Sequence, residues 1–286
     1  MIRFLTVTFA LLLSGACAFE TLNVGDISVQ NLALSDKKLA LSGKNELFFI
    51  DLKNKSIVKK YQSRILSINF KNGKLIILFN NLNKIFNDTG EIFTFKNSIK
   101  PTLNLLSFQN IDDFYLFSNG RNLLKFDSNF KNFKKITLNN SVKIKSAFTL
   151  NDKIYISFFD RNLVLFDKNL NFLKQDKKPF LITAFANLKG EILMGDNKGF
   201  VIAKKNKKKI SNLQIDALLC CQNKIFIGDW GGNLYAYSDD LQNQIYKKQI
   251  FNDRVMALFC NQNEDLIAIS WNGKIAIFNL KERELS

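Results

Sequence analysis

The sequence contains no histidine, and this absence excludes several classes of functional site. A Ser-His-Asp or Cys-His nucleophile cannot be assembled, and no imidazole is present to act as a general base or to bind zinc or iron. Proline occurs only 2 times, and 13 glycines are too few for a collagen-like or linker-rich chain. With only 4 cysteines, the protein is not a disulfide-rich scaffold either.

Acidic residues are scarce relative to basic ones: 25 Asp and Glu stand against 41 Lys and Arg, which gives a formal net charge of +16. Phe, Lys, Asn and Ile are all abundant and all have AT-rich codons, so we expect codon bias to contribute to this basic balance. The 286 residues are 47% hydrophobic, which is enough for a sizeable core in one large domain or two small ones.

The first eighteen residues have the pattern of a signal peptide. Arg3 precedes an apolar run at residues 4–13, which is too short to span a bilayer, and Ala16-Cys17-Ala18 forms a cleavage site. We therefore predict removal of residues 1–18 and export to the periplasm. The alternative is a lipoprotein anchored through Cys17, although Ser14 stands where a lipoprotein signal usually has leucine.

Residues 19–286 repeat one unit of about 38 residues, and the clearest copies lie at 153–167, 224–237 and 266–278. Each copy is an alternating apolar strand, a small residue, a polar or Gly turn and a second alternating strand. Another apolar strand precedes each hairpin, and a Lys-rich stretch follows it. The residues that end the first hairpin strand recur every 33 to 42 positions: Ser42, Leu78, Ser118, Ser157, Gly195, Gly228 and Ser270.

Four strands at a period near 40 residues are the signature of a β-propeller blade. The sequence thus predicts an all-β, seven-bladed propeller with four short antiparallel strands per blade, formed by the single domain 19–286. A β-sandwich would not repeat at this fixed spacing. Because the last unit ends after three strands at Leu280, we predict that Phe19 to Ser28 supplies the outer strand of the last blade and closes the ring.

Two copies resemble known propeller repeats. Gly228 to Tyr237 is similar to the repeat of quinoprotein-type propellers, in which a Gly turn precedes Leu-Tyr-Ala. Ser270 to Phe278 resembles the turn and third strand of a WD repeat, but Phe278-Asn279 replaces the final Trp-Asp, and the structural His of that family is absent. The resemblance implies a propeller, and because the hydrogen-bonding His is missing, we expect its blades to be held together mainly by Phe, Ile and Leu packing.

Size, export, composition and repeats together also resemble the NapL family, which consists of accessory proteins encoded with the periplasmic nitrate reductase in some AT-rich proteobacteria. This resemblance implies a monomeric, non-catalytic scaffold that needs no cofactor or metal and acts through protein–protein interaction in nitrate respiration. One alternative is the propeller lipoprotein of the outer-membrane barrel assembly machinery, which usually has eight blades and a clean lipoprotein box. The other is a propeller enzyme with converging carboxylates or a cofactor in its channel.

The cysteines raise two questions. The adjacent pair Cys220-Cys221 is similar to the vicinal disulfide of quinoprotein alcohol dehydrogenases, but the calcium–carboxylate cluster of those longer enzymes has no match here, which favours ordinary strand cysteines. By alignment of the repeats, Cys221 can face Cys260 across neighbouring blades. A disulfide needs Cα atoms within about 6.8 Å, so the bond requires a place where the blades converge. Cys221–Cys260 is a candidate disulfide, with free buried thiols as the alternative.

Two surface features are candidates for partner binding. The densest basic run is either a solvated hairpin tip or a docking patch for an acidic protein or an anionic membrane, since export excludes nucleic acid: Lys204, Lys205, Lys207, Lys208 and Lys209. Trp230 and Trp271 lie one place apart in the same hairpin turn of adjacent blades. They are either packing aromatics or, beside Asp229 and Asn272, an exposed hot spot. Acid pairs at predicted turns are explained by turn chemistry, and we expect no catalytic residue.

Overall fold

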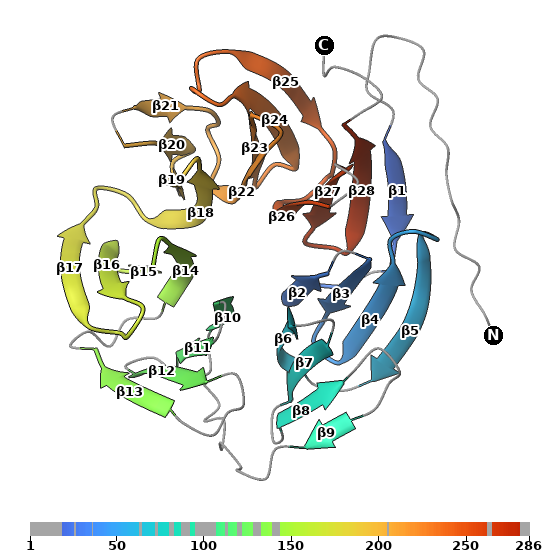
Figure 1. The fold of residues 1–286 in the computed structure, drawn as a ribbon. Helices are drawn as coiled ribbons and strands as arrows, with labels where there is room; N and C mark the ends of the chain where they lie inside the picture. Colours follow the sequence, from blue (N-terminus) through green and yellow to red (C-terminus); the bar gives the residue numbers. More distant parts are fainter. Residues whose placement is uncertain are drawn as a thin grey trace. The chain divides into compact units, whose positions relative to one another are not determined.

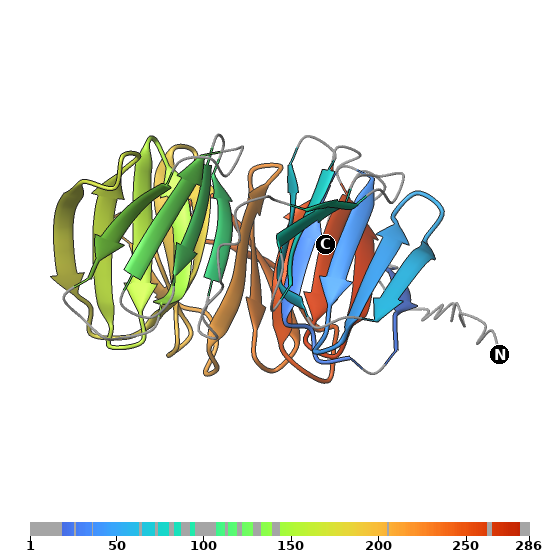
Figure 2. The same ribbon diagram turned by 90° about the horizontal axis from the view of Figure 1, so that it is seen from below.

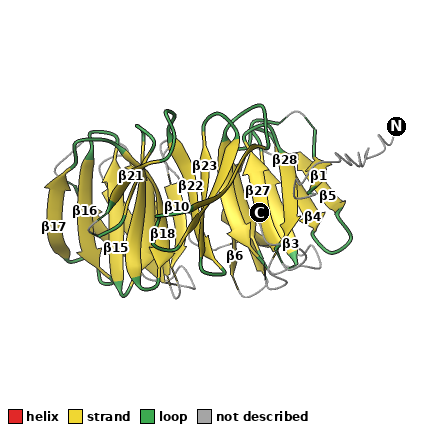
Figure 3. Cartoon of the chain, turned by 90° about the horizontal axis from the view of Figure 1, so that it is seen from above, coloured by secondary structure: helices red, strands yellow, loops and turns green. Residues whose placement is uncertain are grey.

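The computed structural model describes strands and turns between residues 19 and 280, with no helix among the residues described (Figure 3). Consequently, no helix long and apolar enough to cross a membrane occurs in this part of the chain. The predicted signal peptide, Cys17 and Lys205 lie outside the described residues. The structure describes residues 19–25, 27–35, 37–62, 65–71, 74–79, 83–86, 92–94, 107–111, 114–118, 122–127, 133–138, 144–204, 206–261 and 265–280.

The chain forms two compact units, of which one is Val29–Leu181. This unit contains four antiparallel sheets, each made of four consecutive strands (Figure 1). The first two sheets are β2 (Asn31–Leu34), β3 (Lys38–Ser42), β4 (Glu46–Asp51) and β5 (Ser56–Gln62), then β6 (Ile65–Lys71), β7 (Lys74–Phe79), β8 (Asn83–Phe86) and β9 (Ile92–Thr94). The other two are β10 (Ser107–Ile111), β11 (Phe114–Ser118), β12 (Asn122–Asp127) and β13 (Phe133–Thr137), then β14 (Ile144–Leu150), β15 (Lys153–Phe158), β16 (Asn162–Asp167) and β17 (Phe172–Lys177).

The other unit combines Met1–Ser28 with Ile182–Ser286 and contains three four-stranded antiparallel sheets. Two are formed by consecutive strands: β18 (Ile182–Leu188), β19 (Glu191–Asp196), β20 (Phe200–Ile202) and β21 (Lys207–Lys209), then β22 (Ile215–Cys221), β23 (Lys224–Asp229), β24 (Asn233–Ser238) and β25 (Gln244–Gln249). The third has the order β1-β28-β27-β26 and joins β1 (Glu20–Asn23) to β26 (Val255–Cys260), β27 (Asp265–Ser270) and β28 (Lys274–Asn279). The predicted four-stranded antiparallel repeat is therefore confirmed.

Tight turns at both ends of the sheets fix the register of these hairpins, as the sheet β14–β17 shows (Figure 2). Asn151 and Asp152 form a two-residue turn with φ of 50° and 58°, the left-handed values that a type I′ hairpin requires. At a turn between second and third strands, Gly232 has φ of 78°, and its carbonyl oxygen accepts bonds from the Ile250 and Phe251 amides at 2.9 and 3.2 Å. A Cβ at Gly232 would collide with the Phe251 carbonyl, so this turn needs glycine.

The core lies between successive sheets of each unit. In the sheet β22–β25, Ile225 packs in one apolar cluster with Val201 of β20, whereas the next residue, Phe226, packs in another with Leu266 of β27. Successive side chains of a strand point to opposite faces, so both faces of this sheet are buried. This explains why the middle of β23, Ile225 to Ile227, is apolar on both faces.

The N-terminal strand completes the last sheet, as predicted. β1 pairs antiparallel with β28 from Glu20↔Ile277 to Asn23↔Lys274, and Figure 1 shows the two strands side by side. Leu22 is buried, and the ring of Phe19 lies 4.8 Å from that of Phe278 between centroids. The segment is therefore part of the core and not a loose terminus.

The packing of Leu22 provides a test of this strand. We expect Leu22→Ala to lower the free energy of unfolding by about 2–3 kcal/mol, because it removes buried methyl groups and leaves a cavity. Denaturant titration measures the loss. Thr21→Ala, on the opposite and half-exposed face of β1, is the control, and equal losses for both variants would contradict the packing described.

Candidate functional site

Trp230 and Trp271 lie in equivalent turns of neighbouring sheets within one unit. Trp230 follows β23, and its amide donates to the carbonyl of Gln214 at 3.0 Å. Trp271 follows β27, and its amide donates to the carbonyl of Arg254 at 3.1 Å. Gln214 and Arg254 immediately precede the first strands of the same two sheets, so each tryptophan turn is anchored to the connection that enters its own sheet.

The side chain of Arg254 lies close to both indoles. Its guanidinium carbon is 3.9 Å from the ring centroid of Trp271 and 5.7 Å from that of Trp230. Both distances are within the range in which a cation is attracted to an aromatic face. Nη1 of Arg254 also lies 3.5 Å from Oδ2 of Asp216, so the guanidinium is held by two rings and a carboxylate.

Asp216 fixes the exposed indole. Only 8% of its side chain is exposed, and its Oδ2 accepts a hydrogen bond from the indole N–H of Trp230. Its Oδ1 accepts a hydrogen bond from Nε2 of Gln214 at 2.6 Å. Asp216 thus connects the Trp230 ring, the Arg254 cation and the Gln214 amide. We call Trp230, Trp271, Arg254, Asp216 and Gln214 the indole cluster.

The indole cluster carries exposed apolar surface. Trp230 is 50% exposed and Leu213, next to Gln214, is 45% exposed, whereas Trp271 is half-buried. Leu213 packs close to Gly231, which follows Trp230. A large aromatic ring that is half exposed, yet fixed by a buried carboxylate, is the kind of rigid anchor that dominates protein–protein interfaces.

Asp229 does not belong to this surface, which corrects the expectation that it stands exposed beside the tryptophans. Its side chain is completely buried. Oδ1 accepts hydrogen bonds from the amides of Gly231 and Asn233 at 2.9 and 3.0 Å, and Oδ2 accepts them from Ser211 Oγ and the Tyr235 hydroxyl at 2.7 and 3.0 Å. Burial, with Asp229 nearby, raises the pKa of Tyr235 to about 12. Asp229 therefore shapes the turn from inside and is not accessible to a partner.

The basic run lies on the β20–β21 hairpin, and its lysines make contacts within the chain. Lys204 Nζ forms an ion pair with Glu191 at 3.0 Å. The Nζ atoms of Lys207 and Lys209 lie 4.1 and 4.8 Å from the ring centroid of Phe200. These three lysine side chains are exposed, although each interacts with a carboxylate or an aromatic ring of the same chain. A docking role for them stays a prediction.

Lys208 has a structural role in the same run. Its Nζ donates to the carbonyls of Leu241 and Gln242, in the β24–β25 turn of the next sheet, at 2.7 and 2.6 Å. Lys134 of β13 does the same in the other unit, where its Nζ donates to the carbonyl of Asn169 at 2.7 Å. Lysines of outer strands thus link neighbouring sheets, and they account for part of the high positive charge.

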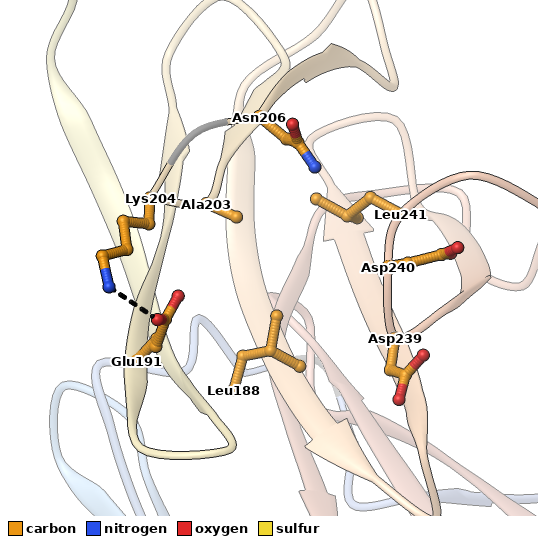
Figure 4. Close-up of a pocket in the computed structure, with 8 residues that line it drawn as sticks. All are labelled: Leu188, Glu191, Ala203, Lys204, Asn206, Asp239, Asp240 and Leu241. Atoms are coloured by element: carbon orange, nitrogen blue, oxygen red, sulfur yellow. Dashed lines mark hydrogen bonds and ion pairs between the residues drawn. The ribbon is translucent and has the colours of Figure 1, made fainter.

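A pocket of about 370 Å³ opens between the β20–β21 hairpin and the β24–β25 turn (Figure 4). The Lys204–Glu191 pair lies at one side, and a hydrogen bond from the Ser238 hydroxyl lowers the pKa of Asp240 at the other. In the described part of the chain, no three or more Cys, Asp or Glu residues gather in a way that would hold a metal ion. The pocket is lined by Leu188, Glu191, Ala203, Lys204, Asn206, Asp239, Asp240 and Leu241.

The structure joins Cys221, the last residue of β22, to Cys260, the last residue of β26, by a disulfide with a Cα–Cα distance of 6.4 Å. The pair suggested by repeat register is therefore brought together. Cys220 is free and half-buried, and burial raises the pKa of its thiol to about 11. At neutral pH this thiol stays protonated and is a poor nucleophile toward the neighbouring disulfide.

Arg254, Asp216 and Leu213 are the site residues that sequence reasoning missed. One signal was available: only 6 of the 41 basic residues are arginine, so an arginine in this Lys-biased chain is unusual. The stacking of Arg254 on two indoles uses its planar guanidinium, which lysine lacks. Nothing comparable distinguishes Asp216 from the other acidic residues of the sequence.

Comparison with known proteins identifies the fold. No family model matches the chain, and no curated protein matches it. Among solved structures, the WD40 β-propeller domain of Doa1 is similar over 92% of this chain and 96% of its own, with a TM-score of 0.74 and 12% identity. The fold is a β-propeller. The computationally designed Ika8 protein is also similar to this propeller over 90% of this chain and 98% of its own, with a TM-score of 0.68 and 12% identity.

Raptor from Chaetomium thermophilum matches the propeller with a TM-score of 0.77 and 11% identity over 92% of this chain, which spans only 28% of Raptor. At such identities the likeness shows the fold and nothing about function. The seven-bladed closed ring and the single-domain boundary remain predictions.

In the sheet β22–β25 of this propeller, a buried hydrogen-bonded group accompanies the apolar packing that the sequence predicted. The buried group Ser211, Asp229 and Tyr235 provides hydrogen bonds without any imidazole. Because buried polar groups are stable only when paired, this group adds specificity to the apolar core around it.

Proposed function

We propose that this propeller is a non-catalytic binding scaffold that docks a protein partner on the indole cluster. The observation that carries the proposal is the half-exposed Trp230, fixed by its hydrogen bond to Asp216 and by Arg254. An anchor fixed in advance loses little conformational entropy on binding, so more of the contact energy contributes to affinity. The missing histidine agrees with a binding role, since it removes the commonest general base.

The proposed compartment is the periplasm. The signal pattern of residues 1–18 supports export, and the Cys221–Cys260 disulfide suits an oxidising compartment. The proposed partner is the periplasmic nitrate reductase, because size, composition and repeats resemble the NapL accessory proteins. This partner assignment rests on resemblance, whereas the docking surface rests on geometry, and the two can be tested separately.

The double variant Trp230→Ala/Trp271→Ala tests the docking surface. Against purified periplasmic nitrate reductase from the same cells, we expect its affinity to fall about thirtyfold or more, since truncating a hot spot costs about 2 kcal/mol or more. Calorimetry or surface plasmon resonance measures the change.

The matched control is Phe172→Ala, which removes a 61% exposed aromatic from β17 in the other unit. Both variants are first compared with wild type by circular dichroism and thermal melting. Equal affinity of the double variant and wild type would exclude the indole cluster as the docking surface. No binding by wild type would exclude the nitrate reductase as the partner.

A further inference from the structure

The guanidinium of Arg254 keeps hydrogen-bond donors that the described residues do not use. A guanidinium has five N–H donors, and only Nη1 faces an acceptor here, with Asp216 Oδ2 at 3.5 Å. Within the part of the chain that the structure describes, Nε and Nη2 of Arg254 form no hydrogen bond. The two indole rings lie near the guanidinium but have no acceptor to offer it, so Nε and Nη2 are left for another acceptor. The side chain of Arg254 is 24% exposed and is therefore partly accessible to a partner.

Carboxylate is the acceptor that best fits such an edge. The planar guanidinium binds carboxylates through two parallel N–H···O bonds, and a cation already fixed by stacking loses little freedom on binding. Asp216 contacts the guanidinium at Nη1 alone, with its Oδ2 at 3.5 Å, so Nε and Nη2 remain for a second carboxylate. The net charge of +16 further favours an acidic partner by steering its approach.

Apolar surface lies alongside the guanidinium. Trp230 and Leu213 are the two large apolar side chains exposed there, and both lie next to Gly231. A chain that places a carboxylate on Arg254 can therefore place a neighbouring apolar side chain on Trp230 and Leu213.

Building on the proposed docking function, we propose that the indole cluster recognises an Asp or Glu side chain next to a large apolar residue in the partner's polypeptide. The carboxylate binds the free edge of Arg254, and the apolar side chain packs on Trp230 and Leu213. The acidic residue provides specificity, since N–H donors of Arg254 that are covered by an apolar ligand without an acceptor would be penalised.

A random peptide library displayed on phage provides the probe. Peptides are selected on wild-type protein after depletion on Trp230→Ala, from a library without Trp, and we expect them to be enriched in Asp or Glu beside Leu, Phe or Met. Binding is then measured by intrinsic tryptophan fluorescence. The chain has only 2 tryptophans and both belong to the indole cluster, so a spectral change reports occupancy of this site.

A double-mutant cycle completes the test. Exchanging the acidic residue of a selected peptide for Gln or Asn should weaken binding to wild type about tenfold and binding to Arg254→Gln hardly at all. Arg254→Lys, which keeps the charge but loses the planar fork, should weaken the acidic peptide by a similar factor. The peptide exchange on wild type is informative even if an Arg254 variant folds poorly.

Two outcomes separate this proposal from the proposed function. Peptides that require Trp230 but contain no acidic residue, or that tolerate its exchange, would overturn the carboxylate proposal and leave the docking surface intact. A library that yields no peptide dependent on Trp230 would overturn both.

Discussion

Replacing Asp229 with alanine will lower the free energy of unfolding by about 3–5 kcal/mol, because several buried donors lose their acceptor at once. The carboxylate is fully buried and accepts four bonds of 2.7 to 3.0 Å from Gly231, Asn233, Ser211 and Tyr235. Of these donors, the Ser211 and Tyr235 hydroxyls are themselves buried, so water cannot replace Asp229 without opening the sheet. Thermal melting should show a decrease of roughly 6–20 °C.

Two further variants separate charge from hydrogen bonding at this position. Asp229→Asn keeps an acceptor for the turn amides, and the two hydroxyls can reorient, so its loss should be smaller than that of Asp229→Ala. Asp240→Ala is the matched control, because Asp240 also accepts bonds from a turn amide and a serine hydroxyl, but at the exposed surface. If the melting temperature falls equally for Asp229→Ala and Asp240→Ala, the buried network is not a main source of stability.

The fold was predictable from the sequence because each repeat is a local pattern of short apolar strands and turn residues. The short apolar segments within 224–237 and 266–278 predict two hairpin strands each, and turn residues such as Gly232 mark their ends. The truncated last repeat even placed the N-terminal strand, since β28 needed a partner that only residues 19–28 were left to supply. These inferences use spacing along the chain, which a single sequence shows directly.

The candidate site was predictable only in part, because its contacts run between connections that are distant in the sequence. Trp230 and Trp271 could be singled out as rare residues in equivalent turns. Their link through Arg254 and Asp216 depends on how two sheets face each other, which spacing does not encode. Asp229 was misplaced for a related reason: an aspartate in a turn is usually solvated, and only the packing of Ser211 and Tyr235 over it reveals its burial.

The first strands of two neighbouring sheets, β22 and β26, are joined to each other at both ends. At their starts, Asp216 and Arg254 form an ion pair beside the indoles, and at their ends Cys221 and Cys260 form the disulfide. The sequence separation of the cysteines is 39, and the bond closes a loop that contains β23, β24, β25 and β26. Constraining a loop of this length removes substantial entropy from the unfolded chain.

Replacing Cys221 and Cys260 together with alanine will therefore lower the free energy of unfolding by about 4 kcal/mol, the chain-entropy value for a closed loop of this length. Dithiothreitol should lower the melting temperature of wild type to that of the double variant, and it should leave the melting temperature of the double variant unchanged. Cys220→Ala is the control: this thiol forms no disulfide, and its pKa of about 11 keeps it protonated at neutral pH, so its loss should have a small effect and leave the disulfide intact. Peptide mapping under non-reducing conditions identifies the bond directly. Three free thiols at positions 220, 221 and 260 in protein purified from the periplasm would contradict both the bond and its stabilising role.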